Sequence, residues 1–271
     1  MLSSISRKID TAGKIVTTFS PASLPEYLKY SRNIPGKPRG NGLLRLGNGL
    51  VFRVRPGTLD AYIVLEVFGR KVYARDADLL RGSRTILDIG AHIGTFTIQA
   101  ASMCPSATVY SFEPVEGNHQ LLRENLELNN IRNVRLFKNA VAGKEERRHF
   151  YVKSSNNSSR LSLLAGEKEE NFRKAAIETT TLANVLRENG IKAVDFMKMD
   201  VEGAEYEILF STPAEVLRKI RYLVMEWHTP AGQGPGVQGI AGFLRKNNFS
   251  VEYESYPGAV SGILYARNLG L

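Results

Sequence analysis

The stretch TILDIGAHIGTF, residues 85–96, constrains the fold more than any other part of the chain. Its first residues form an apolar run broken by one acid, which suits a strand buried on both faces of a parallel sheet. Gly90 and Gly94 then mark a turn where the backbone can approach a ligand closely, and a helical pattern follows. This order of strand, glycine turn and helix predicts the first unit of a nucleotide-binding α/β domain.

Strands and helices alternate from residue 85 onward at lengths that favour parallel strand-helix-strand units. The expected strands are 85–90, 107–113, 134–138, 194–199 and 220–227, and the expected helices are 95–104, 116–130, 182–189, 204–210 and 239–247. Two final strands, 250–256 and 262–267, flank Pro257-Gly258. A closing hairpin after parallel units implies a mixed sheet with one antiparallel strand.

Two regions depart from this alternation. Residues 1–83 are expected to form an accessory cap on a domain of residues 84–271, with a helix at 23–32, a hairpin around Gly47-Asn48-Gly49 and a helix at 59–69. Packing is the preferred role of this cap, and substrate binding is the alternative. Residues 140–153 suggest a strand pair at the sheet margin or over the cofactor, and the polar segment 154–177 is expected to be a substrate lid.

Composition excludes several classes of protein. The single cysteine, Cys104, rules out internal disulfides and, without a Cys/His cluster, structural zinc, so a cytoplasmic protein is expected. No apolar run approaches the roughly 20 residues that a membrane span needs. The net charge of +9 is dispersed along the chain, which favours a solvated surface over an acidic substrate or a nucleic acid.

The residues that follow the five expected strands should converge, because ligands of open α/β sheets bind outside the carboxyl ends of the strands. Glu113 lies about 23 residues after Gly90, the distance expected of an acid that accepts the hydroxyls of an adenosine ribose. NAD would suit this acid equally well. However, the third glycine of Gly-x-Gly-x-x-Gly is absent, which favours S-adenosylmethionine, a cofactor without the pyrophosphate that needs that close approach.

Five later segments carry a resemblance to a known family. In chain order LDIGAHIGTFT, YSFEPVEGNHQLLRENLELNN, NAVAG, ETTTLANVL and FMKMDVEGAEYEIL resemble the FkbM family of S-adenosylmethionine-dependent methyltransferases, over about residues 84–228. The resemblance implies a class I methyltransferase fold, a Rossmann-like α/β sandwich whose mixed seven-stranded sheet has a C-terminal antiparallel strand, here with an N-terminal cap. It also implies O-methylation, often of sugars or natural-product scaffolds. His92 stands where the family usually has Asn.

The resemblance also implies residues that surround the cofactor. They follow three strands and comprise Asp88, Gly90, Ala91 and Gly94 at the methionine end, Glu113 and Pro114 at the ribose, and Asn139 and Ala140 at the adenine. Three asparagines of the next helix, Asn118, Asn125 and Asn129, match the family too. For these we expect structural hydrogen bonds at helix ends and loops.

Methyl transfer is an in-line displacement, so positioning supplies most of the acceleration, and a base is needed only for a poorly acidic hydroxyl. We expect Asp200 to orient the acceptor or the cofactor, and His228 or Glu202 to act as the base. A structural role for His228, as a hydrogen-bonded side chain rather than a base, is kept as the alternative. Glu205 is expected to be either a solvated charge or a charge at a helix N-terminus. No residue is assigned as a metal ligand. A site for Mg²⁺ formed by Asp200, Glu226 and His228 is kept as an alternative, although their spacing in the sequence is not the compact spacing of a metal site.

The sequence thus predicts a monomeric or homodimeric methyltransferase that acts on a small hydroxylated acceptor. The positive charge suggests an RNA or protein methyltransferase as the first alternative. An NAD-dependent oxidoreductase and a non-catalytic binding module with the same fold are alternatives of another class. The acceptor and the methylated atom cannot be read from the sequence.

Overall fold

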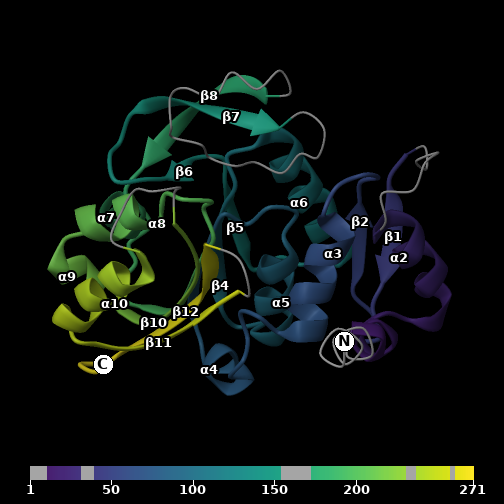
Figure 1. Cartoon of the computed structure of the whole chain (residues 1–271), viewed down its shortest axis with the longest axis horizontal. Coiled ribbons are helices and arrows are strands. Elements are labelled where there is room, and N and C mark those ends of the chain that lie inside the picture. Colours follow the sequence, from purple (N-terminus) through teal and green to yellow (C-terminus); the bar gives the residue numbers. More distant parts are fainter. Residues whose placement is uncertain (1–10, 32–39, 154–171, 230–235, 257–259) are drawn as a thin grey trace.

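A computed structural model describes residues 11–31, 40–153, 172–229, 236–256 and 260–271. It shows a central sheet covered by helices on both faces, with a smaller sheet beyond one end and the N-terminal elements gathered beside α6 (Figure 1). Residues 154–171 of the expected lid lie outside the described residues, as do residues 1–10 of the expected cap.

The central sheet has seven strands in the order β11-β12-β10-β9-β3-β4-β5. In chain order they are β3 (Thr85–Ile89), β4 (Thr108–Phe112), β5 (Val134–Phe137), β9 (Val194–Met199), β10 (Ile220–His228), β11 (Phe249–Ser255) and β12 (Ser261–Asn268). The last strand, β12, is antiparallel to both of its neighbours, whereas the pairs from β10 to β5 are parallel. The expected mixed sheet with an antiparallel C-terminal strand is therefore confirmed.

Alternating strand residues pack into two cores, one on each face of the sheet. Leu87 and Ile89 pack with the cluster of α7 (Leu182–Glu188), α8 (Glu205–Ser211), α9 (Ala214–Leu217) and α10 (Gly236–Lys246). Ile86 packs with the cluster of α5 (Thr95–Met103). Each fully buried Ile or Leu side chain stabilises the fold by about 1.5–3 kcal/mol. Within the described ranges, the helices are too short or too polar to cross a bilayer.

The N-terminal elements are η1 (Pro21–Ser23), α2 (Leu24–Ser31), β1 (Gly42–Arg45), β2 (Val51–Val54), α3 (Asp60–Val64), the π-helix η2 (Leu65–Arg70) and α4 (Ala77–Arg81). Side chains of α2, β1, β2, α3 and η2 share a third core with α6 (Glu116–Leu128), whereas Leu80 of α4 packs with the cluster of α5. The hairpin of β1 and β2 and both expected helices are confirmed. α4 and α9 were not expected, because four or five residues are too few to show a helical period.

Two asparagines of α6 dock the hairpin. Asn125 accepts from Arg53 N at 2.7 Å and donates to Arg53 O at 3.3 Å, and Asn129 makes the same pair of bonds to Val51 at 2.8 and 2.7 Å. Their expected structural role is confirmed, but the partner is mainly a strand of the cap rather than a helix end or loop.

The expected assignments for residues 140–177 were partly wrong. β6 (Ala140–Val141) and β7 (Arg147–Lys153) do not pair with each other, since both pair with β8 (Phe172–Thr180) in a separate three-stranded sheet. The first residues of β8 fall within the segment that we expected to be a polar lid. Strand β8 forms because it pairs with strands that are distant in the sequence. The intrinsic β-propensity of its own residues does not reveal such pairing.

Candidate active site

The turn after β3 brings the backbone of two strands into contact. Gly90 has φ 79° and Gly94 has φ 87°, both in the left-handed region that favours glycine. A Cβ at Gly90 would lie 1.8 Å from the carbonyl oxygen of Asp200, so no other residue fits. His92 has φ 52°. Asn and His are among the few non-glycine residues enriched at such angles, which explains why His can replace the family's Asn.

Glu113, which follows β4, lies beneath this turn and is 3% exposed. Its Oε2 accepts from His92 N at 2.7 Å, and its Oε1 accepts from Val115 N at 2.9 Å and from Asn118 Nδ2 at 3.3 Å. Burial raises the pKa of Glu113 to about 7, although these hydrogen bonds lower it. A carboxylate has about four lone-pair positions, so three bonds fix its orientation and leave room for one more donor.

One cavity joins most of the expected site residues. It is lined by Gly90, Ala91, Glu113, Pro114, Ala140, Asp200 and Glu202, together with Glu226. Asp88, Gly94, Asn139 and His228 are not in its lining. Asp88 is fully buried below the turn, where its Oδ2 accepts from Thr97 Oγ1 at 2.6 Å. Most of the residues expected from the sequence therefore line the cavity, and the others lie outside its lining.

Adenosylmethionine fits the residues that line this cavity. Gly90 and Ala91 line it without a large side chain. Glu113 presents an oriented acceptor where a ribose hydroxyl would donate. Phe112, Pro114 and Val141 add an apolar wall suited to an adenine ring.

Lys198, the penultimate residue of β9, is a buried cation that sequence reasoning missed. Its Nζ donates to Gly90 O at 2.6 Å, lies 3.2 Å from Asp88 Oδ1 and lies 3.9 Å from Asp200 Oδ2. Burial lowers the pKa of Lys198, but Asp88 and Asp200 outweigh it, so the net shift is upward and the lysine stays charged. A lysine between two methionines near the end of a parallel strand was the signal available in the sequence.

Asp200 is held through one of its oxygens, Oδ2. Tyr73 donates its hydroxyl to Asp200 Oδ2 at 3.0 Å, and Lys198 lies over the ring of Tyr73 at 5.2 Å. Burial raises the pKa of Tyr73 well above its usual range, and the neighbouring carboxylates raise it further, so the tyrosine remains a donor.

The cap supplies the opposite wall of the cavity. Leu59, Tyr62, Ile63, Glu66, Val67 and Tyr73 line it, from α3, η2 and the segment that follows. Burial raises the pKa of the Glu66 carboxyl. The π-helix places Glu66 and Val67 in this wall, and single-turn π-helices are frequent at functional sites. The cap therefore lines the cavity as well as packing on the domain, and substrate binding by the cap stays a prediction.

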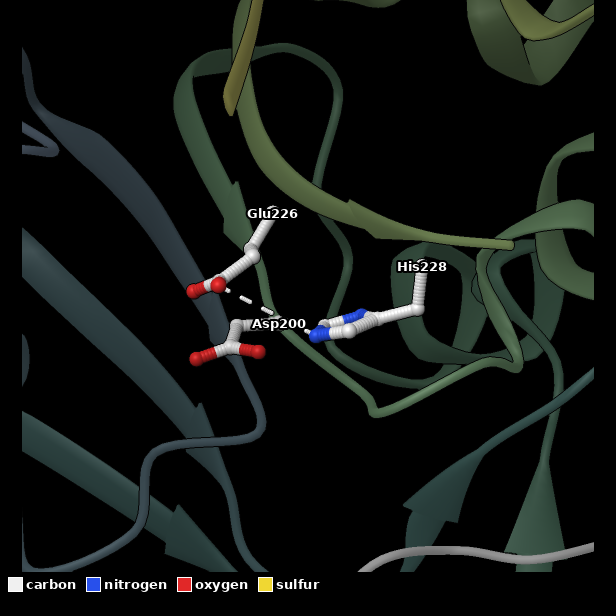
Figure 2. Close-up of side chains that lie close together, drawn as sticks. All are labelled: Asp200, Glu226 and His228. Carbon is white, nitrogen blue, oxygen red and sulfur yellow. Dashed lines mark ion pairs between the residues drawn. The ribbon is translucent and has the colours of Figure 1, made fainter. Parts of the chain in front are cut away.

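Asp200, Glu226 and His228 converge from β9 and β10 (Figure 2). One oxygen or nitrogen atom from each lies within 4.8 Å of the others. His228 Nε2 lies 3.9 Å from Glu226 Oε1 and 3.7 Å from Glu202 Oε2. Burial raises the pKa of Glu226 to about 8, with Asp200 adding to the shift.

Glu205 was expected to be solvated or a helix N-terminal charge, and the solvated expectation was wrong. It begins α8 but is fully buried, and its Oε1 lies 2.9 Å from His228 Nδ1. Burial lowers the pKa of His228, but Glu205 outweighs it and the pKa rises to about 9. The expectation failed because the end of β10 returns over the start of α8, a contact between residues 23 positions apart.

A seven-stranded sheet of this order, with a glycine turn after β3, an oriented acid after β4 and an acid after β9, defines a class I S-adenosylmethionine-dependent methyltransferase. Residues 88–251 match the methyltransferase FkbM domain, and the chain belongs to this family. Family membership decides against the NAD-dependent oxidoreductase considered from the sequence.

Three individual proteins illustrate the range of similarity. The 31-O-demethyl-FK506 methyltransferase FkbM of Streptomyces tacrolimicus is 25% identical over 240 residues, which cover 79% of this chain and 91% of that protein. The AMB antimetabolite synthetase AmbE of Pseudomonas aeruginosa is 27% identical over 228 residues, 70% of this chain but only 10% of that protein. The crystal structure of a SAM-dependent methyltransferase from Agrobacterium tumefaciens covers 93% of this chain and 76% of its own, with 13% identity and a TM-score of 0.49.

Proposed function

We propose that this methyltransferase transfers its methyl group to a hydroxyl oxygen of a small acceptor. The observation that carries the proposal is the single cavity, whose lining runs from Gly90 and Glu113 on the cofactor side to Glu66 and Glu226 on the far side. An oxygen acceptor is further supported by the name of the relative from Streptomyces tacrolimicus, which specifies O-demethyl FK506.

Residues after β3, β4 and β5 are assigned to the cofactor. When bound, adenosylmethionine supplies the electrophilic methyl group. Gly90 and Ala91 would face its methionine end, Glu113 would accept from a ribose hydroxyl, and Pro114 with Ala140 would flank the adenine. Asp88 and Gly94 support this wall from behind it, since neither is in the lining.

Asp200 and Glu226 are assigned to the acceptor. Because Asp200 Oδ2 already accepts from Tyr73, Oδ1 is the oxygen assigned to the acceptor hydroxyl. Glu226 lines the same cavity and is the proposed proton acceptor, in place of the His228 expected from the sequence, because His228 is not in the lining. His228, held by Glu205, would steady the ionised Glu226 as a neighbouring positive charge. Glu202 remains an accessory acid at the rim.

Substitution of the two acids tests this assignment. Asp200→Asn and Glu226→Gln should each lower turnover by about 100-fold, within the usual range for a positioned acid or base. The dissociation constant for adenosylhomocysteine should change less than threefold. Turnover is measured as adenosylhomocysteine released in the presence of a panel of hydroxylated glycosides, and the exposed Glu252→Gln on β11 serves as the control.

Ligand binding and acceptor choice test the proposal more broadly. Adenosylmethionine and adenosylhomocysteine should raise the melting temperature, whereas NAD should not. Absence of stabilisation by either adenosyl ligand would contradict the proposal. Methyl incorporation into RNA or protein, with no turnover of small hydroxylated compounds, would instead support the alternative drawn from the positive charge.

A metal-assisted version of the same reaction is a second candidate. It is favoured by the convergence of Asp200, Glu226 and His228 within 4.8 Å, since carboxylate and imidazole atoms are ligands for divalent cations. The buried Glu205 would orient the imidazole from its other nitrogen, as acids do behind many metal-bound histidines. Turnover that is lost in EDTA and restored by Mg²⁺ would support the metal-assisted reaction. Turnover that EDTA does not change would support the metal-free reaction, in which Asp200 and Glu226 act without a cation.

A further inference from the structure

A line of polar contacts runs from the cap to the cofactor side of the cavity. It starts at Arg55, directly after β2, and at Asp60, the first residue of α3, which is fully buried. Arg55 Nε and Nη2 donate to the two oxygens of Asp60, each at 2.8 Å. Burial raises the pKa of Asp60, but Arg55 outweighs it and the net shift is downward, so the pair is a true ion pair.

The remaining nitrogen of Arg55 extends the line to α6. Nη1 donates to Asn118 Oδ1 at 2.8 Å, and Asn118 is fully buried. An amide whose oxygen is occupied by a guanidinium must present its NH₂ group on the other side. That group donates to Glu113 Oε1 at 3.3 Å. Arg55 therefore determines which way the amide faces, and the amide in turn holds one oxygen of Glu113.

A second branch reaches the other oxygen of Glu113. Asp60 Oδ1 lies 3.7 Å from His92 Nε2, and the backbone N of His92 donates to Glu113 Oε2 at 2.7 Å. Burial lowers the pKa of His92 to about 4, so its ring is neutral at physiological pH. The separation between Asp60 and the neutral His92 ring is too long for a hydrogen bond, so the route that is hydrogen-bonded throughout from the ion pair to Glu113 is the one through Asn118.

Stability alone is a poor explanation for this arrangement. Burying an ion pair costs desolvation that its attraction often does not repay, so well-packed apolar residues would serve a purely structural purpose equally well. The line also ends at a carboxylate in the lining of the cavity rather than within the core. Arg55 and Asp60 precede residues 88–251, the part of the chain that matches the family.

We propose that Arg55, through Asn118, is a positioning residue that holds Glu113 in the orientation that receives the cofactor ribose. The cap is accordingly part of the cofactor site. This inference rests on the proposed role of Glu113 in binding adenosylmethionine, and the following experiment separates the two.

The test is a double-mutant cycle on the dissociation constant of adenosylhomocysteine, measured by calorimetry on the full chain. Arg55→Lys keeps the charge, but one ammonium group cannot serve both Asp60 and Asn118 in the fork geometry of arginine. It should weaken binding about tenfold, the usual effect of losing one hydrogen bond to a charged group. In a Glu113→Gln background, the same substitution should change binding less than twofold.

Two further variants keep the result interpretable. Asn118→Ala interrupts the line one step later while the Arg55–Asp60 pair stays intact, and it should show the same dependence on Glu113. Arg53→Lys, two residues earlier near the end of β2 and with a partly exposed ion pair to Glu124, is the matched control and should leave binding within twofold. The melting temperature of each variant is recorded, so that loss of folding is recognised.

Equal weakening by Arg55→Lys in both backgrounds would overturn the inference, because it would show a general structural role. So would the absence of any weakening while Glu113→Gln alone impairs binding. If Glu113→Gln binds as tightly as the wild type, or if the wild type binds no adenosylhomocysteine, the proposed cofactor role of Glu113 fails first and the inference fails with it.

Discussion

At the scale of single residues, the site depends on charges that are buried and oriented by specific partners. Lys198 links the carbonyl of Gly90 to the carboxylates of Asp88 and Asp200, so the ends of β3 and β9 share one cation. Glu113 is held by three N–H groups. Neither Lys198 nor Glu113 can titrate or move without changing the wall of the cavity, so both should respond to pH and substitution in a defined way.

The raised pKa of Glu113 predicts a pH dependence of cofactor binding. The ionised carboxylate accepts from the ribose, so affinity for adenosylhomocysteine should be lost as pH falls through about 7. Between pH 8 and pH 6 the dissociation constant should rise about tenfold, as expected for one group titrating at the midpoint. His92 stays neutral and Lys198 stays charged over this interval, whereas Glu226, which lines the acceptor side of the same cavity, has a pKa of about 8 and titrates as well. Calorimetry at several pH values measures the effect.

Glu113→Gln provides the control for this pH dependence, because its side chain carries no charge at any pH. Its dissociation constant should be flat between pH 6 and pH 8, and a slope equal to that of the wild type would assign the titration to another group. In the ligand-free protein the sign is opposite. The folded pKa lies above the unfolded value, so ionisation of Glu113 costs stability as pH rises from about 4.5 to 7.

The sequence predicted those residues of the candidate site that follow a strand and line the cavity. Gly90, Glu113 and Asp200 are identified by strand ends and spacing alone, because topology brings strand ends together. Glu66 and Tyr73 were missed since they come from the cap, whose docking leaves no periodic signal. Glu205 was misjudged because its partner, His228, comes from a different strand-helix unit.

At the scale of elements, buried strands and amphipathic helices were predicted to within a few residues. Strand β8 was not predicted, because it depends on pairing with β6 and β7. The helix expected at 59–69 was found, but the sequence did not reveal that its second half is the π-helix η2. The asparagines of α6 show the same limit. Their spacing on one helix face is visible in the sequence, but their partner strand is not.

Removal of one of these asparagines should destabilise the hairpin contact. Asn125 is fully buried and bonds to Arg53 N and O and to Ile93 O, so Asn125→Leu leaves buried backbone groups without partners. We expect a loss of about 3 kcal/mol in the free energy of unfolding, measured by urea denaturation. Gln120→Ala, on the exposed face of α6, should change it by less than about 0.5 kcal/mol. Equal effects of the two substitutions would contradict the docking role.

At the scale of the whole molecule, the cap and the family domain share one core and one cavity. Phe52, Val54 and Leu65 of the cap pack with Ile93 and Leu122 of the domain. A boundary near residue 84 therefore separates two patterns in the sequence rather than two independent folds.

A chain that begins at residue 84 should consequently fail to form a soluble cofactor-binding protein. It would expose the apolar face of α6 that the cap covers and would lose the Arg55 contact to Asn118. We expect aggregation, or a monomer without measurable affinity for adenosylhomocysteine, assessed by size-exclusion chromatography and calorimetry. A soluble fragment with the affinity of the full chain would show that the cap is dispensable.

The docking of β2 on α6 also bears on how the protein avoids unwanted association. A strand with one unpaired side is a template for a strand of another chain. β2 pairs with β1 on one side, and on the other side the amides of Asn125 and Asn129 give Arg53 and Val51 both a donor and an acceptor. A helix thus imitates a neighbouring strand with two side chains, and the sheet edge is closed without adding a strand.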